Sequence, residues 1–105
     1  MPAVREVNDP ITDQSGKVRA HVWVQGYVQG VGFRWFLHKK AAEIGAVGFV
    51  RNLDDGRLEA VFEGTPDQVE ELISNVRSGP DRAHVQSVDL LWEMPTGEYD
   101  ELEVI

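Results

Sequence analysis

The fold is decided by one stretch of the sequence, Gly26-Tyr27-Val28-Gln29-Gly30-Val31-Gly32-Phe33-Arg34. It follows a run of alternating apolar residues and precedes a helical pattern, so it predicts a turn between a strand and a helix. Gly30 and Gly32 allow a tight bend that exposes consecutive N–H groups, and the next helix adds its own unpaired N–H groups. Arg34 adds a permanent, forked cation. We expect this glycine loop (residues 26–34) to bind a small oxyanion, namely phosphate.

The segments on either side of the glycine loop have clear periods. Residues 18–26 alternate between apolar and polar side chains, which is typical of a half-buried strand. From Phe33 to Ile44 the apolar residues recur at helical spacing, and Gly45 is suited to end that helix. The sequence therefore predicts a strand over 18–26 and a helix over 33–44.

The rest of the chain continues with strands and a second helix. Residues 54–56, Asp-Asp-Gly, predict a tight turn between two strands. Residues 65–68, Thr-Pro-Asp-Gln, predict a helix start in which the Thr and Gln side chains form a capping box, and Gly79 ends that helix. The remaining strands are expected at 47–53, 58–63, 85–93 and 102–104.

This order of elements predicts an α+β fold. We expect a ferredoxin-like βαββαβ sandwich, with a mostly antiparallel sheet, two helices on one face and a short extra C-terminal edge strand. In that topology the first two strands of the domain run parallel, with the third between them. Their carboxyl ends then lie at one edge, so Asn52 is expected on the side of the glycine loop, about 10 Å away across two strand spacings.

Composition indicates a single domain. The chain has 105 residues, of which 42% are hydrophobic, and this is enough for one core. Residues 1–17 show no sustained hydrophobic period, so we expect a flexible N-terminal tail there. A short strand through Val4 and Val7 is the alternative. The domain itself is expected to span 18–105.

Charge and cysteine content limit the partners. Ten Lys and Arg against eighteen Asp and Glu give a net charge of −8, which opposes binding of nucleic acid through a basic face. No cysteine is present, the three histidines are scattered, and no apolar run approaches the roughly 20 residues that span a membrane. The N-terminus also lacks the apolar segment of a secretion signal. We expect a soluble, cytoplasmic monomer with no metal, no cofactor and no membrane or nucleic-acid partner.

Two motifs carry a resemblance to a known family. The glycine loop resembles the acylphosphatase signature, and Gly48-Phe49-Val50-Arg51-Asn52 is similar to a second stretch of that family at the family's spacing. The resemblance runs from about Val18 to the C-terminus. It implies hydrolysis of acyl phosphates to carboxylate and inorganic phosphate, with Arg34 binding the phosphoryl oxygens and Asn52 orienting the attacking water. The backbone N–H groups of Gln29, Gly30, Val31, Gly32 and Phe33 would complete the phosphate site.

The chemistry of the loop residues favours the same reaction. Residues 26–34 contain no Cys, Ser, Thr, Asp, Glu or His, so a covalent phosphoenzyme is not expected and water must be the nucleophile. No general acid is evident. An acyl phosphate needs none, because its leaving carboxylate has a conjugate acid with a pKa of about 4 to 5. A phosphomonoester would need a proton or a metal at its leaving alkoxide.

Other interpretations remain open from the residues alone. The same order of elements builds an RNA-binding domain, although Asn52 and Leu53 stand where an aromatic stacking residue is needed. A non-catalytic anion-binding regulatory module would keep Arg34 and the glycines but would not need Asn52. His38, one turn beyond Arg34, is expected to be a solvated surface residue.

Overall fold

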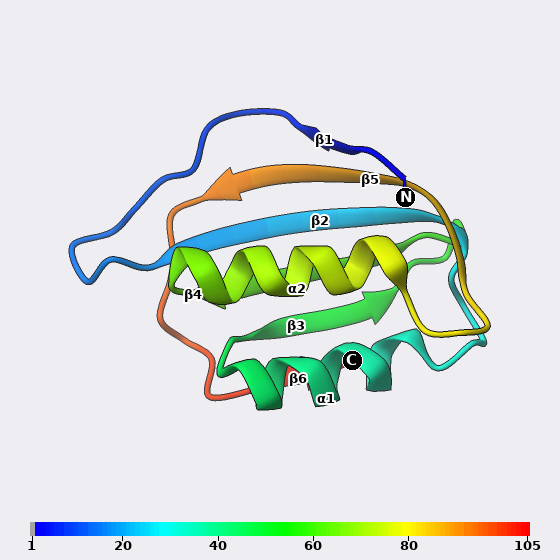
Figure 1. Ribbon diagram of the computed structural model, residues 1–105. Coiled ribbons are helices and arrows are strands. Elements are labelled where there is room, and N and C mark those ends of the chain that lie inside the picture. Colours follow the sequence, from blue (N-terminus) through cyan, green and yellow to red (C-terminus); the bar gives the residue numbers. More distant parts are fainter. Residues whose placement is uncertain (1) are drawn as a thin grey trace.

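Six strands form one mixed sheet, and two helices pack on one of its faces (Figure 1). The protein is described here by a computed structural model that covers residues 2–105. The strands lie in the order β1-β5-β2-β4-β3-β6. The elements are β1 (Val4–Glu6), β2 (Val18–Tyr27), α1 (Phe33–Ile44), β3 (Val47–Asn52), β4 (Leu58–Gly64), α2 (Pro66–Ser78), β5 (His84–Glu93) and β6 (Leu102–Val104).

The alternation of β2 sets the core. Val18, Ala20, Val22 and Val24 are each no more than 1% exposed. Strand β2 lies between β4 and β5 and is antiparallel to both. Strand β4 is also antiparallel to β3, so β2 and β3 run parallel with β4 between them. The predicted βαββαβ sandwich is therefore confirmed, and the carboxyl ends of β2 and β3 lie at one edge of the sheet.

The two helices begin in different ways. Thr65 caps α2 as predicted: its Oγ1 accepts a hydrogen bond from Gln68 N at 3.3 Å, and Gln68 Oε1 accepts one from Thr65 N at 2.9 Å. Helix α1 has no side-chain cap; it begins after Gly32, which is left-handed at φ 79°. The first N–H groups of α1 are therefore not used by a capping side chain.

The N-terminal segment reaches the sheet. Strand β1 pairs in parallel with β5, so the short strand named as the alternative for the tail is present over Val4–Glu6. Trp92 Nε1 donates to Glu6 Oε1 at 2.9 Å, and the Asn8 amide accepts from Trp92 N at 2.8 Å and donates to Trp92 O at 2.9 Å. These contacts hold residues 4–8 against β5, although the sequence shows no period there.

The predicted C-terminal edge strand closes the other side of the sheet. Strand β6 pairs in parallel with β3, with Gly48 opposite Leu102. Gly48 has a φ of 143°, and a Cβ atom there would lie 1.8 Å from the carbonyl oxygen of Val61 on β4. Glycine is therefore required at this position because the backbones of β3 and β4 approach so closely.

Candidate active site

The glycine loop leaves β2 at an irregular point. The pairing of β2 with β5 shifts between Gln25 and Gly26, and Gly26 has a φ of 135°. A Cβ atom on Gly26 would lie 2.1 Å from the carbonyl oxygen of His84. The bulge bends the end of β2, which is a common device where a strand leads into a functional loop.

Two glycines give the loop its backbone conformation, and two valines anchor it in the hydrophobic core. Gly30 and Gly32 have φ angles of 73° and 79°, while a Cβ atom on either would meet nothing within 4 Å. Their requirement is therefore conformational and not steric. Val28 and Val31 are 1% and 6% exposed and join the core. The backbone N–H groups of residues 29–33 make no backbone hydrogen bond within residues 2–105, so these donors have no partner in the backbone of that range.

Arg34 lies in the first turn of α1. Its Nη1 donates to the main-chain oxygen of Ile105, the last residue of the sequence, at 3.0 Å. No Asp or Glu side chain within residues 2–105 forms an ion pair with it. The charge of the guanidinium is thus not neutralised by an acidic side chain, although the chain as a whole is strongly acidic.

Asn52 ends β3, opposite Leu58. Its Oδ1 is buried and accepts no hydrogen bond from any group of residues 2–105. A buried acceptor without a partner costs about 1 to 3 kcal/mol, and such groups call for an explanation. The Oδ1 atom of Asn52 is therefore available to accept a hydrogen bond from a ligand or from a reacting molecule.

Two connections tie the glycine loop and Arg34 to the end of β3. The side chain of Gln29 donates from Nε2 to Leu53 O at 2.7 Å and to Arg57 O at 3.0 Å, and Leu53 directly follows Asn52. Ile105, which binds Arg34, donates its own N–H to Val50 O at 3.0 Å. Gln29 and Arg34 are thus both attached within two residues of Asn52, and this agrees with the edge predicted from the topology.

His38 corrects one expectation. It was expected to be solvated, but it is half-buried, and its Nδ1 donates to Leu102 O at 2.7 Å. Its ring also meets Trp35 edge-on, with the centroids 5.6 Å apart. One turn separates His38 from Arg34, and both side chains bond carbonyl groups in or just after β6. The helical period of α1 was predicted correctly. Strand β6, which pairs with β3, also packs against α1 and covers the face that carries His38.

A cluster of hydrogen-bonded titratable side chains on the sheet face turned away from the helices was not predicted. His21 Nε2 lies 2.8 Å from Glu59 and Nδ1 lies 2.9 Å from Glu93, while Arg19 binds Glu93 at 2.8 Å. Burial raises the pKa of Glu59 and of Glu93, but hydrogen bonds from His21 and the neighbouring arginines outweigh it, and each pKa is lowered. This outer-face cluster comprises Arg19, His21, Arg51, Glu59, Glu63 and Glu93.

Glu63 closes one end of the outer-face cluster. It binds Arg19 at 2.7 Å and accepts the backbone N–H groups of Thr96 and Gly97 at 3.0 and 3.1 Å. Glu63 is 4% exposed and Glu59 is 7% exposed. The alternation along β4 places both carboxylates on the face away from the helices, where neighbouring side chains and the 94–101 segment bury them. The cluster joins strands to the 94–101 segment and contains none of the predicted site residues.

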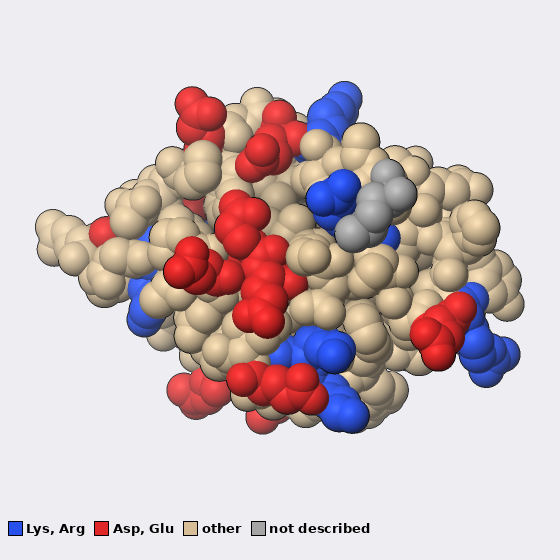
Figure 2. Space-filling view, in the orientation of Figure 1, with Lys and Arg blue, Asp and Glu red and all other residues tan. Residues whose placement is uncertain are grey.

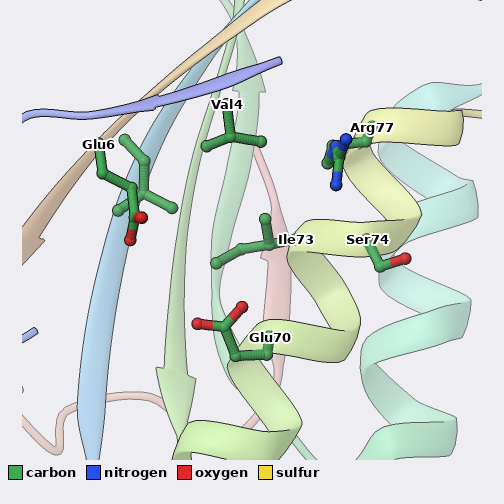
Figure 3. A pocket seen from close by; sticks show the side chains of 7 residues that line it. Val4, Glu6, Glu70, Ile73, Ser74 and Arg77 are labelled. Atoms are coloured by element: carbon green, nitrogen blue, oxygen red, sulfur yellow. The ribbon is translucent and has the colours of Figure 1, made fainter. Parts of the chain in front are cut away.

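A hollow of about 240 Å³ also lies away from the candidate site (Figure 3). It is enclosed by β1, α2 and β5, and its lining residues are Val4, Glu6, Glu70, Ile73, Ser74, Arg77 and Leu90. No predicted site residue lines this hollow, so it does not define the active site.

Acidic side chains form a patch over α2 on the helical face, and Lys and Arg side chains lie around it (Figure 2). Figure 2 shows acidic side chains gathered over α2, which carries Asp67, Glu70 and Glu71 as exposed residues. Such a face does not suit a nucleic-acid backbone. Within residues 2–105 there is no helix long and apolar enough to cross a membrane, and no group of three or more His, Cys, Asp or Glu side chains is placed to hold a metal ion.

The fold and the site together define a class of protein: a ferredoxin-like α+β domain with an arginine-bearing glycine loop beside a strand that ends in Asn. The acylphosphatase family model matches residues 20–104 of the chain. An acylphosphatase from Roseiflexus is 54% identical over 80 residues, which cover 76% of this chain and 86% of that protein.

Solved structures agree. The crystal structure of an acylphosphatase from Bacillus subtilis superposes with a TM-score of 0.80 at 27% identity, covering 84% of this chain and 98% of that one. An acylphosphatase from Coxiella burnetii gives a TM-score of 0.79 at 35% identity, with 88% and 96% covered. The chain belongs to the acylphosphatase family, and the expected acylphosphatase activity is confirmed at that level. The family implies an acyl phosphate substrate, and residues 2–17 lie outside the matched region.

Proposed function

We propose that the chain hydrolyses acyl phosphates by a mechanism that uses binding and orientation alone, with no metal or covalent intermediate. Arg34 and the backbone N–H groups of Gln29 to Phe33 hold the phosphoryl oxygens. Asn52 holds the attacking water through its Oδ1. The unpaired buried Oδ1 of Asn52, tied to the glycine loop through Leu53, is the observation that carries this proposal.

The contacts of Arg34 suit a phosphoryl ligand. A guanidinium has five N–H donors, of which the main-chain oxygen of Ile105 uses one. The remaining donors and the N–H groups at the start of α1 can bind the equatorial oxygens as charge builds on them. The Ile105 contact also fixes the orientation of the guanidinium before substrate arrives, which reduces the entropy lost on binding.

The reaction balances without a protein acid. A water that donates one hydrogen bond to Asn52 Oδ1 attacks phosphorus, a new P–O bond forms, and the bond between phosphorus and the acyl oxygen breaks. The carboxylate leaves with the electron pair, and the proton of the attacking water passes to the phosphate. The carboxylate is a good leaving group, so orientation and charge stabilisation are sufficient.

The partners follow from this mechanism. Substrate and product are an acyl phosphate and inorganic phosphate, and the chain works as a monomer without a cofactor or nucleic acid. The acidic α2 face and the net charge of −8 support the last point.

Phosphate release from acetyl phosphate tests the proposal directly. The protein should turn over acetyl phosphate and leave a phosphomonoester with an alkoxide leaving group, such as glycerol 3-phosphate, essentially untouched. Turnover should survive full dialysis against a chelator. Activity that disappears and returns only with a divalent ion would contradict the metal-free mechanism, and phosphate binding without turnover would indicate the anion-binding module.

A further inference from the structure

The side chain of Gln29 spans the space between the glycine loop and the turn that joins β3 to β4. Its Nε2 donates to Leu53 O at 2.7 Å and to Arg57 O at 3.0 Å. The residue is half-buried. Both hydrogens of the amide nitrogen are therefore directed at backbone carbonyl groups of a segment that is 24 and 28 residues away in sequence.

The turn does not need Gln29 in order to close. Leu53 N donates to Arg57 O at 2.8 Å, and Gly56 N donates to Leu53 O at 3.2 Å. Arg57 N and Nε are in turn held by the carboxylate of Asp55. Each carbonyl that Gln29 reaches thus already has a partner within the turn. Its two additional hydrogen bonds fix where the turn lies relative to the glycine loop.

We infer that Gln29 is a positioning residue that sets the separation between the phosphate site and the water held by Asn52. This inference rests on the proposed function. The backbone N–H of Gln29 belongs to the phosphate site, while its side chain holds the residue that follows Asn52. One residue therefore connects the two halves of the site, and it does so without touching substrate through its side chain.

A positioning role predicts a specific kinetic pattern. Displacement of a reacting group by about 1 Å can reduce the rate by as much as 10²-fold. Gln29→Met keeps the length of the side chain but removes both donors. We expect kcat to fall about 10-fold or more, while inhibition by inorganic phosphate changes by less than about twofold, because the loop backbone and Arg34 remain.

A double-mutant cycle with Asn52→Ala shows whether the effect passes through Asn52. Once Asn52 is removed, the position of the turn no longer matters for the water, so adding Gln29→Met should leave kcat unchanged from that of Asn52→Ala. Gln25→Met is the matched control, since Gln25 is an exposed glutamine of β2 whose side chain, among the described residues, makes one hydrogen bond, accepted from Ser87 Oγ at 3.1 Å. It should retain wild-type kcat.

The outcomes separate this inference from the proposed function. A wild-type protein that does not hydrolyse acetyl phosphate overturns both. An active wild-type protein with Gln29→Met equal to it, or with the losses of Gln29→Met and Asn52→Ala multiplying in the double variant, overturns the positioning role alone. If circular dichroism shows Gln29→Met to be unfolded, Gln29→Asn decides. It keeps the amide but is one methylene too short to reach both carbonyl groups, so kcat should again fall while phosphate inhibition holds.

Discussion

Arg34 Nη1 and the main-chain oxygen of Ile105 lie 3.0 Å apart, and Ile105 N donates a hydrogen bond to Val50 O of β3 at 3.0 Å. The guanidinium of Arg34 is therefore held by the residue that follows β6, and that residue is itself hydrogen-bonded to β3. An arginine can keep this contact while its other donors bind a phosphoryl group, because its N–H groups point in several directions in one plane.

Replacement of Arg34 by lysine should damage both binding and catalysis. A lysine is a point charge and cannot bind Ile105 and two phosphoryl oxygens together. We expect Arg34→Lys to weaken competitive inhibition by inorganic phosphate and to lower kcat, each by about 10-fold or more. Steady-state kinetics with phosphate as inhibitor measures both. Arg82→Lys, at an exposed arginine between α2 and β5, should behave as wild type. Full activity in Arg34→Lys would contradict the assignment.

Removal of Asn52 should affect only the chemical step. We expect kcat of Asn52→Ala to fall by about 10² to 10³, or about 3 to 4 kcal/mol, as for loss of one positioned hydrogen-bonding group. Phosphate inhibition should stay unchanged. Because the variant also removes a buried acceptor without a partner, its free energy of unfolding in urea should not be lower than that of the wild type.

Asn75→Ala on α2 is the control for that experiment, since among the described residues the Asn75 side chain bonds only Glu71 O of its own helix, at 2.9 Å. It should retain kcat. If Asn52→Ala lost phosphate binding as severely as Arg34→Lys, Asn52 would belong to the phosphate site and not to the water.

Deletion of the N-terminal segment should separate stability from activity. A chain that begins at Val18 loses the β1 pairing and the three hydrogen bonds to Trp92. At about 1 kcal/mol for each bond, the three hydrogen bonds to Trp92 alone contribute roughly 3 kcal/mol, so the free energy of unfolding should fall by at least that amount once the backbone pairing of β1 is lost too. Strand β5 separates β1 from β2, so kcat should be retained. Chemical denaturation and turnover of acetyl phosphate test this, and an equal loss in both would show that the segment supports the site.

The outer-face cluster should make the fold sensitive to acid. The pKa values of Glu59 and Glu93 are lower in the folded protein than the ordinary value of 4.5. A carboxyl group with a lowered pKa stabilises the fold above its unfolded pKa, and that stabilisation is lost as pH falls through the folded pKa. The free energy of unfolding should therefore decrease as pH falls below about 4.5.

His21→Leu tests the cause of that decrease. It removes the imidazole shared by Glu59 and Glu93, so the decrease in unfolding free energy between neutral pH and pH 3 should become smaller. Glu71→Gln, on the exposed face of α2, should leave the profile unchanged. Parallel urea titrations across that range provide the comparison. An unaltered profile in His21→Leu would show that other carboxylates dominate.

Local patterns were sufficient to predict most of the fold. The alternation over β2, the capping box at Thr65 and the glycine at the end of α1 each involve residues that are close in sequence, and each predicted element is present. The glycine loop follows from the pattern of a strand, two glycines and a helix. Its position at the same edge of the sheet as Asn52 follows from the topology, in which β2 and β3 run parallel. The catalytic roles of Arg34 and Asn52 remain predictions.

Contacts between distant segments could not be read from the sequence. Strand β1 has only three residues, and its partner on β5 lies 84 residues away, so no period reveals it. Glu59 and Glu63 occupy polar positions of an alternating strand, but the arginines and the 94–101 segment bury them. The side-chain contacts of Gln29 and His38 similarly depend on which loops and strands meet in space. A pattern over one segment carries no such information.

The strand order also has a consequence for how fast the chain folds. Only β3 and β4 are joined by a short turn; among the described residues, β1 pairs with β5 and β2 pairs with both β4 and β5 across long intervening segments. Closing such long loops costs entropy before the contacts can compensate, and proteins dominated by distant pairings fold in milliseconds to seconds. We therefore expect slow refolding. The hairpin of β3 and β4, whose strands are joined by the turn between Asn52 and Leu58, can form first because its strands are neighbours along the chain.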